Sequence, residues 1–123
     1  MKKILIVEDS QTMRLFIRMS LRHLPEISVS EATDGLDAIE RMEKEGFDLI
    51  ITDIHMPRMD GLGLIESLRA KMGIKTPIIV LSTESEEREM GRAILLGANS
   101  YATKPIMGNR LVGLVGDYLR LAA

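Results

Sequence analysis

The chain has 123 residues, a length typical of one compact domain, and its formal net charge at pH 7 is −2. It contains no Cys, which excludes disulfides and thiolate metal sites, and no apolar run long enough to span a membrane. The balanced charge and the few aromatic residues (two Phe, two Tyr and no Trp) provide no surface for nucleic acid. Nothing at the N-terminus is typical of a signal peptide. We therefore expect one cytoplasmic domain over residues 1–123 that binds neither nucleic acid nor membrane directly.

Short apolar runs alternate with amphipathic stretches along the chain. Five runs predict strands, at residues 3–7, 27–32, 49–52, 77–81 and 101–103. The first, third and fourth are apolar throughout, as in strands that are covered on both faces of a parallel sheet. Five stretches with helical periodicity follow them in turn, at residues 10–24, 36–45, 62–72, 86–96 and 111–121. The last helix is expected to be frayed or irregular, because Gly113 and Gly116 each cost about 1 kcal/mol relative to Ala in a helix interior.

This alternation predicts a doubly wound α/β fold, since consecutive strand-helix units with right-handed crossovers place helices on both faces of a sheet. We expect a flavodoxin-like three-layer sandwich around a five-stranded parallel sheet with strand order 2-1-3-4-5. Ligands of such sheets bind outside the carboxyl ends of the strands. The residues that follow each predicted strand are therefore the candidates for a functional site.

Polar residues follow four of the five predicted strands. Glu8 and Asp9 follow the first strand, Asp53 the third, Ser82 the fourth and Lys104 the fifth. Carboxylates that converge raise one another's pKa unless a cation lies among them, so the acids indicate a divalent metal or a shared proton. Taken singly, every member except Asp53 has an ordinary structural interpretation, such as Asp9 capping the first helix or Lys104 lying in solvent. The complete set on successive strand ends argues for a functional site.

With these residues the chain resembles the receiver domain of bacterial response regulators over essentially its whole length. The segments that carry the resemblance are ILIVEDS (4–10), DLIITDIHMPRMDG (48–61), VLS (80–82) and GANSYATKP (97–105). The resemblance implies that Asp53 is the phosphoacceptor, taking a phosphoryl group from the phosphohistidine of a histidine kinase or a histidine phosphotransfer protein. It also implies that Mg²⁺ is held by Glu8, Asp9 and Asp53 together with the backbone carbonyl of His55.

The resemblance assigns roles to three further residues. Ser82 would bond a phosphoryl oxygen, Lys104 would pair with the phosphate, and Tyr101 would be the aromatic residue that changes orientation on activation. The residue chemistry fits these roles, because Mg²⁺ takes oxygen ligands and phosphoryl transfer needs positioning and charge neutralisation more than covalent help. The Lys104-Pro105 bond is a candidate cis peptide, since X-Pro bonds tolerate the cis form.

Three other functions fit parts of this pattern. A haloacid-dehalogenase-type phosphatase also uses an Asp nucleophile with Mg²⁺, but it needs a second acid where this chain has His55. A flavodoxin that binds FMN needs a phosphate loop rich in glycine and hydroxyls where this chain has Glu8 and Asp9. A receiver fold that no longer transfers phosphate would be a constitutive binding module, and the complete set of site residues argues against it. His55 itself is either a bulky group beside the path of an attacking water or an exposed loop histidine.

We expect a single-domain response regulator that is not an enzyme acting on other substrates. Its output would be phosphorylation-dependent binding to a downstream protein, and chemotaxis regulators and phosphorelay intermediates both fit this description. Ile106 stands where many receivers have Phe after the Lys-Pro pair, a departure that concerns output rather than phosphorylation.

The first helix is expected to be the docking surface for the phosphodonor protein. On a helical wheel Arg14, Arg18 and Arg22 form an exposed stripe beside Leu15 and Met19, which suits an apolar contact with an acidic rim. The alternative is a solvated face with two ordinary exposed apolar residues. The opposite face is expected to pack on the core with Met13, Ile17, Ser20 and Leu24, and Phe16 and Leu21 are expected on the same side.

Overall fold

The computed structural model describes residues 1–120, and its five strands form one parallel sheet in the order β2-β1-β3-β4-β5. The predicted sheet and its strand order are therefore confirmed. Every strand ends at the same edge of the sheet, which is where the polar residues of the predicted site lie. The strands are β1 (Lys2–Val7), β2 (Ile27–Ala32), β3 (Leu49–Asp53), β4 (Ile78–Ser82) and β5 (Ser100–Thr103).

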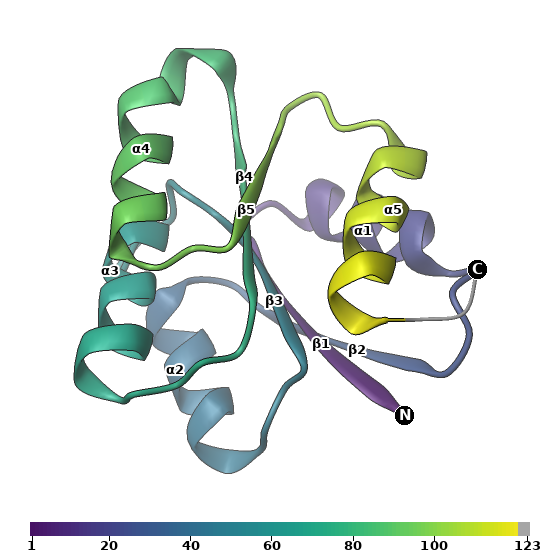
Figure 1. The fold of residues 1–123 in the computed structure, drawn as a ribbon, viewed down its shortest axis with the longest axis horizontal. Coiled ribbons are helices and arrows are strands. Elements are labelled where there is room, and N and C mark those ends of the chain that lie inside the picture. The colour runs from purple at the N-terminus through teal and green to yellow at the C-terminus, as the bar shows by residue number, and fades with distance from the viewer. Residues whose placement is uncertain (121–123) are drawn as a thin grey trace.

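Helices cover both faces of the sheet, which confirms the three-layer sandwich (Figure 1). On one face lie α1 (Gln11–Leu21) and α5 (Gly108–Leu119). On the other face lie α2 (Gly35–Lys44), α3 (Gly61–Glu66) and α4 (Glu87–Leu96). A π-helical turn (Ser67–Lys71) extends α3, and a 3₁₀ turn (Glu84–Glu86) precedes α4. No helix within residues 1–120 combines the length and the apolar character needed to cross a membrane.

The core consists of two layers because successive side chains of a strand point to opposite faces. In β1, Leu5 and Val7 pack with the α2, α3 and α4 side, whereas Ile4 and Ile6 pack with α1 and α5. All four of these side chains are completely buried. This explains why the first, third and fourth predicted strands are almost continuously apolar, as expected for a sheet covered on both faces.

Three local predictions differ from the structure. α1 ends at Leu21 rather than at residue 24, since Pro25 disfavours helical backbone at the residue before it. Phe16 was expected on the buried face of α1 but is 39% exposed. The expected fraying of α5 is wrong within the described residues: the helix is continuous across both glycines, because its buried stripe anchors it to the sheet. Position 121, where this helix was expected to end, lies outside the described residues.

Candidate functional site

Three carboxylates meet at the carboxyl edge of the sheet. β1 and β3 are neighbours with Val7 opposite Thr52, so Glu8 and Asp9 emerge beside Asp53, the last residue of β3. One carboxylate oxygen from each acid lies within 4.8 Å of the others. Glu8 and Asp53 are 1% and 8% exposed, whereas Asp9 is exposed to solvent. The convergence expected from the strand order is thus present in the structure, and two of the three charges are held away from water.

Lys104, which follows β5, reaches this cluster from the other side. Its Nζ lies 3.0 Å from Oδ2 of Asp53 and 3.6 Å from Oε1 of Glu8. The Lys104 backbone N–H donates to the Ser82 carbonyl oxygen at 2.6 Å, which ties the loop after β5 to the end of β4. The Lys104-Pro105 bond is cis, as expected. One ammonium group therefore faces two buried carboxylates.

The electrostatics of the cluster follow from burial and crowding. Burial raises the pKa of Glu8 to about 7, and a hydrogen bond with Asp9 and the charge of Asp53 act in the same direction. Burial lowers the pKa of Lys104, but the hydrogen bond to Asp53 and the charges of Asp53 and Glu8 outweigh it, and the pKa rises above its ordinary value. The lysine therefore stays charged, while the site as a whole carries more negative charge than one lysine balances.

Two buried oxygens at this edge lack a hydrogen-bond partner among residues 1–120. They are Oε1 of Glu8 and Oγ of Ser82. A buried oxygen without a partner is costly, so each marks a position where a bound group would be favoured. Glu8, Asp9 and Asp53 offer only oxygen ligands, which is the donor set that Mg²⁺ prefers. The residues present therefore fit a hard divalent cation.

The loop between β3 and α3 is held tightly against the end of β3. The Gly61 N–H donates to the Ile54 carbonyl oxygen at 2.7 Å, and the Ile54 N–H donates to Oδ1 of Asp53 at 2.8 Å. A Cβ at position 61 would lie 2.2 Å from the Asp53 carbonyl oxygen, so only glycine fits there. Asp60 caps α3 by accepting from the Gly63 N–H at 2.8 Å. This packing fixes the position of the Asp53 carboxylate.

His55 forms a contact that neither sequence-based interpretation contained. Its Nε2 lies 2.8 Å from Oε2 of Glu86, although the imidazole remains 63% exposed. The other carboxylate oxygen of Glu86 accepts a hydrogen bond from the Thr83 N–H at 2.6 Å. The loop after β3 is therefore connected to the start of α4 at the side of the site. Nothing in the sequence marks this pair, because its members lie on different loops with no fixed spacing.

The residues expected on the switch and docking surfaces include Tyr101 on β5 and four residues of α1. Tyr101, on β5, is 44% exposed. On α1, Leu15 and Met19 are 56% and 50% exposed, as the helical wheel suggests. Arg18 and Arg22 are exposed as expected, but the Arg14 side chain is only 15% exposed, which corrects the prediction at that position. Arg14 and Arg18 both pair with Glu31 of β2. A helical wheel cannot reveal such partners on another element.

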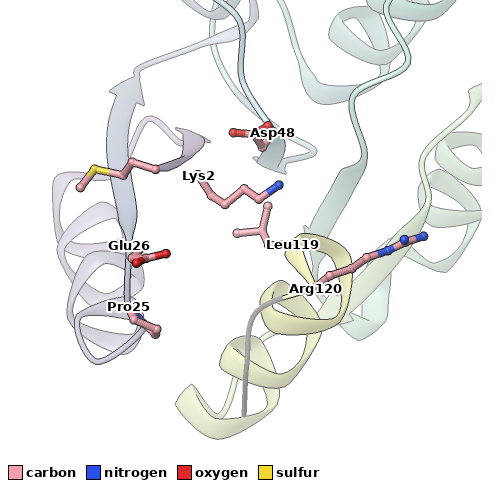
Figure 2. Close-up of a pocket in the computed structure, with 7 residues that line it drawn as sticks. Lys2, Pro25, Glu26, Asp48, Leu119 and Arg120 are labelled. Atoms are coloured by element: carbon pink, nitrogen blue, oxygen red, sulfur yellow. The ribbon is translucent and has the colours of Figure 1, made fainter.

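A pocket of about 530 Å³ lies at the opposite edge of the sheet, near the amino ends of the strands (Figure 2). Its labelled residues include Lys2 and Asp48, which lie where β1 and β3 begin, and Leu119 and Arg120 at the end of α5. Their charges are of both signs. The carboxylate cluster stands at the far ends of the same strands, so this pocket is separate from it.

The fold and the edge cluster define the class of the protein. The sequence matches the family model of the response regulator receiver domain over residues 4–115, and the chain belongs to this family. Its curated relatives include chemotaxis proteins.

The chain is 38% identical to the chemotaxis protein CheY-3 of Vibrio cholerae over 104 residues, which cover 84% of this chain and 80% of that protein. It is 36% identical to the chemotaxis protein CheY of Pseudomonas aeruginosa, with 84% of each chain covered. Among solved structures, the receiver domain of the Francisella response regulator 1452 superposes with a TM-score of 0.87 at 30% identity and covers 98% of both chains. The chain is therefore a receiver domain similar to CheY proteins, and phosphoacceptor signalling is the activity of its family.

Proposed function

We propose that Asp53 is the phosphoacceptor of this receiver domain. The observation that carries the proposal is the position of its carboxylate, which ends a buried strand among two further acids with the Lys104 ammonium 3.0 Å away. An oxygen of Asp53 attacks the phosphorus atom of a phosphohistidine, and the phosphorus-nitrogen bond breaks with its electron pair returning to the imidazole. The donor is a histidine kinase or a histidine phosphotransfer protein. Water later attacks the phosphorus atom of the acyl phosphate, which restores the carboxylate and releases inorganic phosphate.

The acids beside Asp53 are proposed to hold Mg²⁺. Glu8, Asp9 and Asp53, with the backbone carbonyl of His55, are the ligands, and the unpartnered Oε1 of Glu8 supports this assignment. When bound, the ion neutralises and orients the phosphoryl oxygens. Burial raises the pKa of Glu8, and a cation bound beside it would favour its ionised form.

Ser82 and Lys104 are proposed to bind the phosphoryl group once it is on Asp53. The Lys104 ammonium is already within hydrogen-bond distance of Asp53, and the buried Ser82 Oγ has its donor free among residues 1–120. Movement of Ser82 toward the phosphate would open space for the half-exposed Tyr101 to turn inward, a two-state change that a downstream protein reads. Lys104→Ala should still accept phosphate, but beryllofluoride should no longer shift the amide signals around Tyr101. Equal shifts in the variant and in wild type would contradict this coupling.

The exposed apolar residues of α1 are proposed as the docking surface for the phosphodonor protein. Leu15 and Met19 are each at least half exposed. They lie on α1, which begins two residues after Asp9 and is therefore close to the acceptor site. Arg14 and Arg18 border them, although both already pair with Glu31. The contact is therefore expected to depend more on the apolar pair than on arginine charge.

Labelling with a small phosphodonor tests the proposal without a partner protein. With Mg²⁺ and acetyl phosphate, wild type should gain one base-labile phosphoryl group by intact mass, and chelator should prevent the gain. Asp53→Asn should gain none. Asp48→Asn is the matched control, because Asp48 precedes the same strand at its other end. Equal labelling of wild type and Asp53→Asn would contradict the assignment.

A further inference from the structure

The junction between β2 and α2 contributes no carboxylate to the cluster of Glu8, Asp9 and Asp53. Two arginines beside that cluster nevertheless form ion pairs with acids of the junction. Its acids are Glu31, near the end of β2, and Asp34, the residue before α2. Glu31 bonds Arg14 of α1, and Asp34 bonds Arg58 of the β3–α3 loop. These two partners lie next to the two chain segments that carry the proposed metal ligands.

The bond between Arg58 and Asp34 is bidentate. Arg58 Nε donates to Oδ2 of Asp34 at 2.7 Å and Nη2 donates to Oδ1 at 3.1 Å. Asp34 is only 3% exposed, and Oδ1 also caps α2 by accepting from the Asp37 N–H at 2.9 Å. The Arg58 guanidinium holds the pKa of the Asp34 carboxyl below its ordinary value. The pair is therefore fixed at one end by a buried, capping carboxylate.

Two backbone features show that the β3–α3 loop is pressed against this junction. Arg58 has φ of 61°, in the left-handed region that non-glycine residues avoid, so its surroundings hold it there. The Gly35 N–H donates to the Met59 carbonyl oxygen at 2.9 Å. A Cβ at position 35 would lie 2.8 Å from that same oxygen, which only glycine allows. The loop that contains His55 is thus bonded to the start of α2 through Arg58 and Met59, near its α3 end.

The second arginine holds the other segment. Arg14 Nε donates to Oε1 of Glu31 at 2.7 Å, and Arg14 Nη1 donates to the Glu8 carbonyl oxygen at 2.8 Å. Glu8 is itself tied on its far side, because its Oε2 accepts from the Ser10 N–H at 3.1 Å. Glu31 therefore orients Arg14, which donates a hydrogen bond to the backbone of Glu8, a proposed metal ligand.

We propose that Glu31 and Asp34 are positioning residues that set the spacing between the two ligand-bearing segments, Glu31 through Arg14 and Asp34 through Arg58. We call this set the junction brace. It touches neither the phosphoryl group nor the metal, and it acts through the backbone on either side of the carboxylate cluster. The inference rests on the proposed function, because it concerns the construction of the same metal site.

A Mg²⁺ titration followed by amide chemical shifts tests the brace directly. Asp34→Asn keeps an N-cap for α2 but removes the negative charge that Arg58 binds. Glu31→Gln removes the negative charge that Arg14 binds. Each substitution should weaken Mg²⁺ binding by about tenfold, the low end of the effect of residues that orient metal ligands. Arg58→Ala should match Asp34→Asn, since both break the same bond. Arg41→Ala and Glu43→Gln on exposed positions of α2 are the controls, and their dissociation constants should equal the wild-type value.

Labelling by acetyl phosphate separates positioning from damage to the fold. If the brace only positions the ligands, saturating Mg²⁺ should return the labelling rate of Asp34→Asn to that of wild type. Wild-type Mg²⁺ affinity in Asp34→Asn and Glu31→Gln would overturn the brace while leaving the proposed function intact. A slow labelling rate of Asp34→Asn that persists at saturating Mg²⁺ would also overturn the brace. Failure of wild type itself to bind Mg²⁺ would overturn the metal site, and the brace with it.

Discussion

Replacement of Glu8 by Gln is expected to make the metal-free protein more stable at alkaline pH. Glu8 is 1% exposed, and its pKa in the folded protein is raised from 4.5 to about 7 by burial, by the bond with Asp9 and by the charge of Asp53. A group whose pKa is higher in the folded state contributes stability below its unfolded pKa and loses it as pH rises through the folded value. The wild-type fold should therefore weaken as pH rises from 4.5 to about 7.

The size of this effect follows from the change in pKa. One pKa unit corresponds to about 1.4 kcal/mol, so the rise from 4.5 to about 7 sets an upper bound of about 3.5 kcal/mol. Because Glu8 interacts with neighbouring charged groups, the effect of this residue alone is smaller, and about 2 kcal/mol is expected. Glu8→Gln has no ionisable group at this position, so this pH dependence should be absent.

Urea unfolding in the presence of EDTA, from pH 5 to pH 8.5, measures the effect. The difference in unfolding free energy between Glu8→Gln and wild type should grow with pH and reach about 2 kcal/mol above pH 8. Glu43→Gln, on the exposed face of α2, is the control and should follow the wild-type curve. A Glu8→Gln curve parallel to that of wild type across this range would show that Glu8 does not cause the pH dependence. In wild type, Mg²⁺ at ten times its dissociation constant should add roughly 1.4 kcal/mol.

Three further substitutions test other parts of the structure. Lys104→Met should destabilise the metal-free protein by about 2 kcal/mol at pH 8, because it leaves buried carboxylates without their cation, and urea unfolding with EDTA would show it. Arg69→Met should cost about 2 kcal/mol in the same assay, since Arg69 donates to the carbonyls of Gly97 and Ile74 and to Oδ1 of Asn99; a loss below about 0.5 kcal/mol would contradict this. Leu15→Asp should slow phosphotransfer from the cognate phosphohistidine protein but leave labelling by acetyl phosphate unchanged, and a parallel change in both rates would exclude α1 as the docking surface.

The sheet and the strand-end residues could be predicted because both depend on local sequence. Apolar runs such as residues 49–52 identify strands that are buried on both faces, and Asp53 directly after one is placed at the sheet edge by chain connectivity alone. The meeting of Glu8, Asp9 and Asp53 then follows from the strand order. Their specific roles came from the resemblance, since carboxylates near one another are equally consistent with a metal and with a shared proton.

The contacts between elements could not be predicted in the same way. Arg14 lies on the apparently exposed side of α1, and only the folded chain shows that Glu31 of β2 faces it. His55 with Glu86 and Arg58 with Asp34 likewise join loops at separations that no motif specifies. A chain with eighteen acids offers each arginine many possible partners. Helix propensity also misled the interpretation of α5, because burial of its apolar stripe outweighs the cost of its glycines.

Locating the acyl phosphate on the chain shows directly whether Asp53 carries the phosphoryl group. Borohydride reduces an aspartyl phosphate to homoserine, so peptide mass spectrometry of the labelled and reduced protein identifies the modified position. Homoserine is expected at position 53 alone, and none is expected when Mg²⁺ is removed by EDTA before labelling. Homoserine at position 9 instead of position 53, or a stable phosphate on a hydroxyl residue, would contradict this expectation.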